Sequence, residues 1–170
     1  ANTWYVSSSE DCNAAGVCGS ALTNDESLHV GSTVLGDIGA AYYAGGFMGD
    51  ATTNRRAESP TIDCSGRSSI TIDFNYIENG EGSSDNATLD ISYDNGASWS
   101  TLQDLSKTAL CGGGQGLWTN YNTTLPAAAD NNSNVKIGFN WTNNNNSSGT
   151  DPSFAVDDIT LTGTGAAPAN

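Results

Sequence analysis

The residues of this chain that are best suited to chemistry are its carboxylates, which outnumber the basic residues 19 to 5 and give a net charge of −14. Hard cations such as Ca²⁺ are bound by carboxylate, carbonyl and water oxygens. Asp157 and Asp158 are adjacent in a strand-like segment, so their side chains point to opposite faces and one of them must point inward. Because a buried carboxylate without a partner is costly, we expect a cation beside it.

The sequence therefore predicts that Ca²⁺ stabilises the fold. Asp37 and Asp50 flank a glycine-rich stretch that can fold back and add carbonyl oxygens. The predicted ligands are Asp158, Asp50, Asp37 and Asp157. The alternative is that Arg55 or Arg56 pairs with the inward carboxylate, in which case no metal is needed.

Catalytic chemistry has less support in the sequence. A Ser-His-Asp triad would have to use His29, the single histidine, which lies inside a probable strand and is not preceded or followed by a nucleophile elbow. We expect His29 to be structural. The many acids leave a carboxylate pair for glycoside hydrolysis open, so a small polysaccharide hydrolase or lyase remains an alternative.

Aromatic side chains in loops suit the binding of sugars, whose C–H faces stack on rings while amide, carboxylate or guanidinium groups bind the hydroxyls. Several aromatic residues lie in or beside glycine-rich stretches, and Arg55-Arg56 is the one adjacent basic pair. The predicted ligand-binding residues are Trp118, Tyr121, Tyr43, Trp99, Arg55 and Arg56. For each of them, packing or salt bridging within the fold is the competing interpretation.

These residues must be positioned by short strands. Apolar and polar residues alternate over residues 70–77, 87–93 and 135–142, and the last strand is expected at residues 154–162. Asp94-Asn95-Gly96 follows the second of these segments and predicts a tight hairpin whose returning strand carries Trp99. Further strands are expected at residues 2–7, 27–32 and 56–62. Strands at roughly ten-residue spacing, separated by turn signals, predict an all-β sandwich of two antiparallel sheets.

The four cysteines, Cys12, Cys18, Cys64 and Cys111, indicate an oxidised, secreted or cell-surface protein. We predict a Cys12–Cys18 disulfide, because the intervening loop is short and contains glycine, and by exclusion a Cys64–Cys111 disulfide. The alternative is that the cysteines are free buried thiols.

The charge balance also excludes classes of partner. Nucleic-acid binding needs clustered Lys and Arg, so a chain of net charge −14 is not expected to bind nucleic acid or an anionic membrane surface. No apolar stretch approaches the length of a transmembrane helix, so membrane insertion is not expected.

Several segments, taken in order, resemble the MAM-like and cleaved-adhesin-type jelly-roll modules of secreted Bacteroidetes proteins. They are the sequences NRRAESP at 54–60, IDFNYI at 72–77, LDISYDNGASW at 89–99 and FAVDDITL at 154–161. The resemblance extends from about Ser27 to Gly163. It implies a jelly-roll related to galactose-binding-like folds, calcium near the Asp157-Asp158 pair, and a role in adhesion or carbohydrate binding.

We therefore expect residues 1–163 to form one sandwich module, and residues 164–170, which are small and flexible types, to be a linker within a larger multidomain protein. The predicted function is a non-catalytic carbohydrate-binding or adhesin module of an exported bacterial protein, with a polysaccharide or cell-surface glycan as its partner. A structural spacer in a surface adhesin is the alternative from another class.

Overall fold

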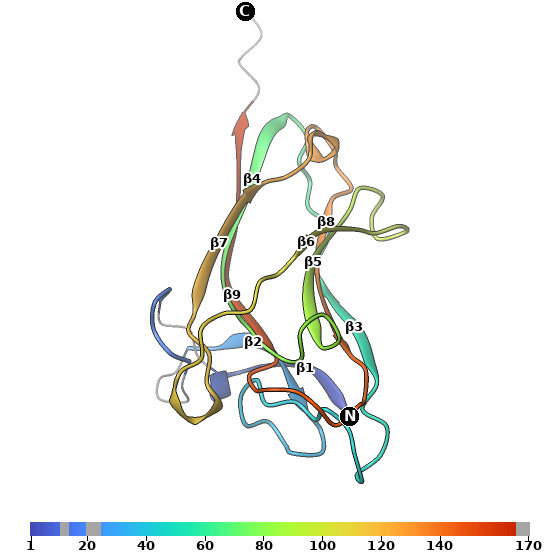
Figure 1. Cartoon of the computed structure of the whole chain (residues 1–170). Helices are drawn as coiled ribbons and strands as arrows, with labels where there is room; N and C mark the ends of the chain where they lie inside the picture. Colours follow the sequence, from blue (N-terminus) through green and yellow to red (C-terminus); the bar gives the residue numbers. More distant parts are fainter. Residues whose placement is uncertain (11–13, 20–24, 166–170) are drawn as a thin grey trace, which may run out of the picture.

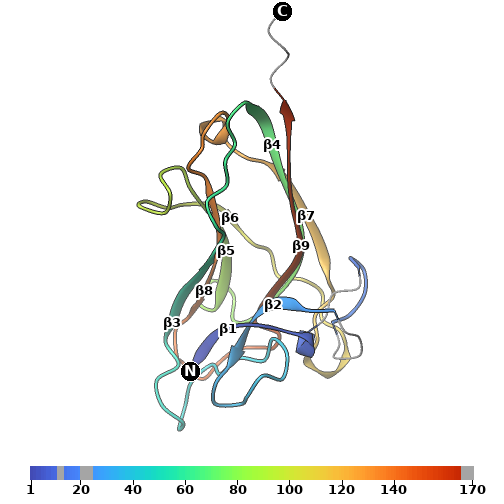
Figure 2. The same ribbon diagram turned by 180° about the vertical axis from the view of Figure 1, so that it is seen from behind.

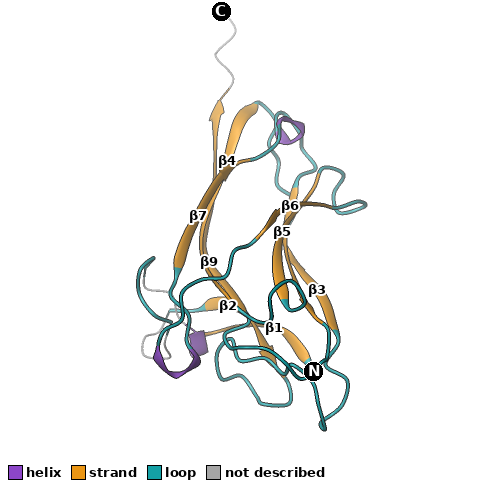
Figure 3. Ribbon diagram, in the orientation of Figure 1, coloured by secondary structure: helices purple, strands orange, loops and turns teal. Residues whose placement is uncertain are grey.

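The computed structural model describes residues 1–10, 14–19 and 25–165, and builds them almost entirely from strands and loops (Figures 1 and 3). The described residues include three short 3-10 helices: η1 (Ser8–Glu10), η2 (Gly112–Gly114) and η3 (Ala127–Ala129). The strands are β1 (Asn2–Ser7), β2 (Ser27–Ser32), β3 (Thr53–Glu58), β4 (Arg67–Glu78), β5 (Asn86–Ser92), β6 (Ser100–Asp104), β7 (Thr119–Thr124), β8 (Lys136–Asn143) and β9 (Phe154–Gly165).

The strands form two antiparallel sheets that face each other, as the two opposite views show (Figures 1 and 2). One sheet has the order β1-β2-β9-β4-β7 and the other the order β3-β8-β5-β6. Neighbouring strands are mostly distant in sequence, which is the pattern of a jelly-roll sandwich. The predicted all-β sandwich of two antiparallel sheets is thus confirmed.

The alternation of residue types explains why these segments are strands. Along β4, Ile70, Ile72, Phe74 and Tyr76 are buried while the residues between them are only partly covered. The facing sheet contributes Phe139, whose ring packs edge-on against that of Phe74 at 5.1 Å. Alternate residues of both sheets therefore interdigitate in one core, as in other sandwiches.

Strand β9 continues to Gly165, two residues into the segment predicted as a linker, and residues 166–170 lie outside the described part. Strand β7 was not among the predicted strands. Its sequence, TNYNTT, has one large apolar residue, Tyr121, so the period of two gives almost no signal. The hairpin after β5 is confirmed: Asn95 and Gly96 have φ values of 60° and 91°, and β6 returns antiparallel to β5.

The predicted disulfide pairing is wrong. Cys18 is bonded to Cys111, and Cys64 is a free, buried thiol packed into the core. Cys12 lies outside the described residues. Its predicted partner, Cys18, is bonded instead to a cysteine 93 positions away in the sequence. The Cys18 segment runs beside Trp118, with Trp118 N–H donating to the Val17 carbonyl at 2.9 Å. The disulfide thus fastens residues 14–19 to the chain that enters β7.

Two carboxylates, Glu78 and Asp85, are fully buried at the end of β4 and in the loop that follows it. The Lys107 ammonium binds Glu78 Oε1 and also donates to the carbonyls of Asn79 at 2.7 Å and Asp85 at 2.8 Å. Asp85 accepts the Tyr42 hydroxyl at 2.7 Å. One lysine therefore supports the carboxylate and the backbone of this turn together.

Cleavage of the chain without reduction should yield a cross-linked pair of peptides containing Cys18 and Cys111. Cys18→Ser should lower the free energy of unfolding by about 2–5 kcal/mol, because a disulfide closing a long loop restricts the unfolded chain. Mass spectrometry and denaturant unfolding measure the two effects. Cys64→Ala is the control and should leave the cross-link in place. A Cys64–Cys111 peptide pair in the wild type would contradict the assignment.

Stability should also depend on Glu78. Burial raises the pKa of its carboxyl to about 7, although Lys107 and the Ala87 N–H bind it. A folded pKa above the unfolded value means that the protonated form is favoured in the fold, so stability is lost as the pH rises from about 4.5 to about 7. Relative to Glu78→Gln, the wild type should lose about 3 kcal/mol between roughly pH 5 and pH 8.

Urea unfolding at a series of pH values measures this difference. The control is Glu81→Gln, because hydrogen bonds from Asn146 and Ser148 lower the pKa of the Glu81 carboxyl, so that its titration lies below that range. Parallel pH profiles for the wild type and Glu78→Gln would show that Glu78 does not titrate between the two states.

Candidate functional site

The outer surface of the four-stranded sheet carries a continuous set of polar side chains, here called the polar face. It arises because each strand alternates, so the residues between the core positions point outward. Its members from β3, β8, β5 and β6 are Asn54, Arg56, Glu58, Lys136, Asn140, Thr88, Asp90 and Thr101. The pairing register brings these residues, which lie far apart in the sequence, beside one another.

Arg56 is the centre of the polar face. Its guanidinium donates from Nη1 to Asp90 Oδ2 at 3.3 Å and from Nη2 to Glu58 Oε1 at 3.3 Å. Lys136 Nζ lies 3.7 Å from Glu58 Oε2. Asp90, whose side chain is almost buried, accepts the hydroxyls of Thr88 and Thr101, each at 3.0 Å. These bonds connect all four strands.

An aromatic ring lies on the polar face because of the predicted hairpin. Trp99, just before β6, is half-buried and donates its indole N–H to the Gly96 carbonyl at 3.1 Å. The Arg56 guanidinium lies 3.9 Å from the centre of the ring, within cation–π distance. Of the six residues predicted to bind a ligand, Arg56 and Trp99 are thus brought together.

Gly138 provides the space for this pair. A Cβ placed at Gly138 would lie 2.4 Å from Arg56 Cδ and 2.9 Å from Trp99 Cζ3. Any larger residue at this position would therefore lift both side chains off the sheet. The result is a half-buried ring with charged hydrogen-bond donors and acceptors around it, which is the combination that sugar rings require.

The other predicted ligand-binding residues lie elsewhere. Trp118 was predicted to offer a ring to a ligand, but it is fully buried and packs with Ile77 and Ala155 beneath the loops that cover the five-stranded sheet. That prediction is wrong because the preceding glycine-rich stretch bends back over the sheet and takes the indole with it. Tyr121 points between the sheets, with its ring 5.2 Å from that of Phe74.

Tyr43 and Arg55 also lie away from the polar face. The Tyr43 hydroxyl accepts the Met48 N–H at 2.8 Å and so shapes its own loop. Arg55 is exposed, and its carbonyl accepts the Trp4 indole N–H at 3.1 Å. The Tyr43 loop carries Phe47, which is fully exposed and was not considered in the sequence. The glycines around Phe47 indicate a loop, and this was the sequence signal that could have identified it as exposed.

The four acids predicted to bind calcium do not converge. Asp37 accepts from His29 Nε2 at 2.8 Å, and exposed Asp50 accepts the Thr52 N–H at 2.8 Å. Asp158 accepts from the Asn75 amide at 2.9 Å. Within the described residues, no group of three or more His, Cys, Asp or Glu side chains is placed to hold a metal ion. A single site built from all four acids is therefore not formed.

Asp157 differs from the other three. Its Oδ2 is buried and has no hydrogen-bond partner among the described residues. Burial raises the pKa of the Asp157 carboxyl, and the charges of Asp158 and Asp25 raise it further. A partly buried carboxylate beside other acids, with one oxygen that accepts no hydrogen bond, is the part of the calcium prediction that the geometry fits.

His29 lies between a serine and an aspartate. Its Nδ1 is 3.4 Å from the Ser27 hydroxyl and its Nε2 is 2.8 Å from Asp37 Oδ1. The order imitates a catalytic triad, but Ser27 and His29 are buried, and the Ser27 hydroxyl donates to the Glu10 carbonyl. The hydroxyl is therefore engaged within the fold and is not presented to a substrate.

No described helix is long and apolar enough to cross a membrane. A search of curated proteins found no significant match. The sequence profile of the family described as Reelin subrepeat B matches residues 38–162, which span most of the chain from the loop before β3 into β9. The disulfide and this match both point to an extracellular location. The chain belongs to the Reelin subrepeat B family.

Proposed function

We propose that this chain is a non-catalytic binding module of an exported protein, and that it binds a polysaccharide or cell-surface glycan on the polar face. The observation that carries the proposal is the Trp99 ring beside Gly138, with the Arg56 guanidinium stacked over the ring. Glu58, Asp90 and Lys136 supply hydrogen-bonding groups around that ring. These groups are already positioned by one another, so binding would order few side chains.

The same geometry favours a second candidate, a structural spacer in an adhesin. Arg56 directs its hydrogen bonds to Glu58 and Asp90, so the charges of the polar face are largely satisfied within the fold. A structural spacer needs its surface charges to be paired within the fold, and it needs no ligand. The hydrolase or lyase alternative has less support, because the carboxylates of the polar face are engaged by cations and hydroxyls.

Affinity electrophoresis against a panel of neutral, uronic and sulfated polysaccharides tests the proposal. Retardation on at least one polymer is expected. Trp99→Ala should weaken that binding about tenfold or more, the loss expected for an aromatic residue at the centre of a site. Gly138→Ala should weaken it as well, because the added methyl displaces Arg56 and Trp99 without removing either.

Phe47→Ala is the matched control, since it truncates an exposed aromatic side chain on a loop outside the polar face. Equal loss of binding in Phe47→Ala and Trp99→Ala would move the site to that loop. Unretarded migration of the wild type on every polymer would favour the spacer.

We also propose that Ca²⁺ stabilises the fold at Asp157. The support is its buried, unpartnered Oδ2 and the acidic surroundings that raise its pKa. A cation there would neutralise repulsion among Asp157, Asp158 and Asp25. The proposal concerns stability, and no catalytic step follows from it.

The melting temperature should fall on addition of EDTA and recover with excess Ca²⁺, because a ligand that binds only the folded state raises its stability. Asp157→Asn should remove this response. Asp50→Asn is the control, as Asp50 is exposed and only closes a local turn with Thr52. Identical melting curves with EDTA and with Ca²⁺ would rule out a stabilising site.

A further inference from the structure

The upper part of β9 is an open sheet edge. Strand β9 pairs with β4 along most of its length, but on its other side β2 pairs only with Ala155 and Val156. From residue 159 to residue 165, no described strand lies on that side. Half of the backbone N–H and C=O groups of this stretch, here called the β9 edge, therefore have no strand to pair with.

The β9 edge lacks the charged residues and proline that often protect such edges, although its pairing with β4 shifts register between Thr162 and Thr164. Its sequence, ITLTGTG, contains no lysine, no proline and no acid. All of its residues except Leu161 are exposed. Exposed edges normally carry charges, proline or bulges that prevent pairing with another chain. An exposed edge without charged residues or proline is suited to receive a strand.

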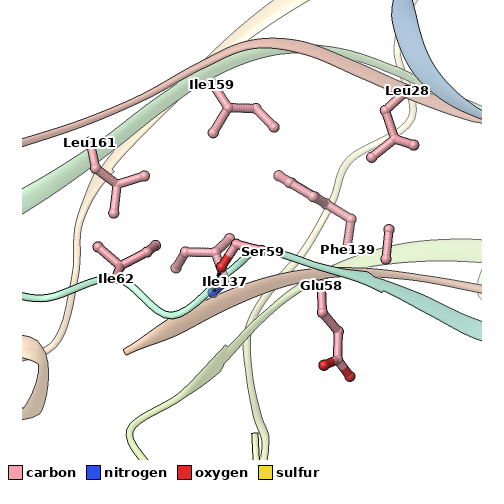
Figure 4. A pocket seen from close by; sticks show the side chains of 9 residues that line it. Leu28, Glu58, Ser59, Ile62, Ile137, Phe139, Ile159 and Leu161 are labelled. Carbon is pink, nitrogen blue, oxygen red and sulfur yellow. Dashed lines mark hydrogen bonds between the residues drawn. The ribbon is translucent and has the colours of Figure 1, made fainter. Parts of the chain in front are cut away.

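An apolar slot between the two sheets lies beside the β9 edge (Figure 4). Leu28, Ile159 and Leu161 line it from one sheet, and Ile62, Ile137 and Phe139 from the other side. Its cavity measures about 140 Å³. A second cavity, of about 240 Å³, continues along the edge and shares Ile62 and Leu161 with the first.

The two features together specify the chemistry of an occupant. Only a polypeptide backbone supplies N–H and C=O groups at the spacing of a strand, and alternate side chains of that strand lie about 7 Å apart on one face. Successive inward side chains would then enter the two adjoining cavities. Every strand pairing described in the fold is antiparallel, and an added strand is expected to follow.

Charge selects between a foreign segment and a second copy. Asp157 and Asp158 begin this part of β9, and Glu58 and Asp63 line the cavities, against Arg67 alone among the lining basic residues. Two copies of a chain of net charge −14 would repel each other at this edge. A segment with basic residues would be attracted.

We propose that the β9 edge and its slot bind an extended segment of another polypeptide, with alternating aliphatic residues and basic flanks, as an added antiparallel strand. The slot lies between the sheets and the polar face lies outside them, so the two proposed surfaces share only Glu58, at the rim of the slot. Failure of one proposal therefore leaves the other intact.

The test is titration of the full chain with the synthetic peptide acetyl-KTVTVTVK-amide, followed by NMR. Saturable binding is expected, with amide-exchange protection gained at residues 159–165. Ile159→Asp should weaken binding about tenfold or more. The added aspartate would by itself attract the basic peptide. Weaker binding would therefore result from the lost apolar contact in the slot. Ile38→Asp, the same change at an exposed loop isoleucine, should bind like the wild type.

Two N-methylated peptides distinguish strand addition from unspecific apolar contact. Only alternate N–H groups of an added strand face β9, so methylation of either the valine or the threonine amides should abolish binding, and methylation of the other set should be tolerated. Equal binding of both methylated peptides, unchanged binding to Ile159→Asp, or absence of saturation would overturn the proposal. A dimer of the chain alone that Ile159→Asp dissociates would assign the edge to a second copy and also overturn it.

Discussion

The fold depends on how an acidic chain with five basic residues satisfies the carboxylates that it buries. Lys107 is one answer: its ammonium bonds to Glu78, to the Asn79 and Asp85 carbonyls and to the Asn86 side chain. These groups close the turn from β4 to β5, which belong to different sheets. Without this cation, Glu78 would be a buried charge with no ionic partner, and the turn would lose its shared support.

Where no cation is nearby, neutral hydrogen-bond donors satisfy the buried carboxylates. Asp85 is held by the Tyr42 hydroxyl and the Asn144 N–H, and burial beside Asp85 raises the pKa of Tyr42 far above its usual range. Tyr42 in turn packs edge-on against Trp141 of β8, with ring centres 5.3 Å apart. The long loop before β3 is thereby attached to the core. These contacts hold the ends of the strands that carry the polar face.

The sequence predicted the sheets better than the site. Apolar and polar residues alternate along the sequences of strands β4, β5 and β8, and Asn95-Gly96 is a dipeptide that favours tight hairpin turns, so the local pattern was sufficient there. The disulfide and Trp118 depended on which loop folds over which sheet, and no local rule determines this. Arg56 and Trp99 were chosen for their chemistry, but their contact requires the β3-β8 register and a glycine at 138, which only the tertiary structure reveals.

The disulfide between Cys18 and Cys111 has a mechanical consequence. If the chain is pulled from its two ends, as in a tethered surface protein, tension bypasses the segment between the two cysteines. The two cysteines are 93 positions apart in the sequence. While their disulfide is intact, roughly 300 Å of chain between them cannot be extended. Strands β2 to β6 lie inside this loop, and β1 and β7 to β9 lie outside it. Force alone would detach only β1, β7, β8 and β9, whereas reduction of the disulfide would allow the full length to extend.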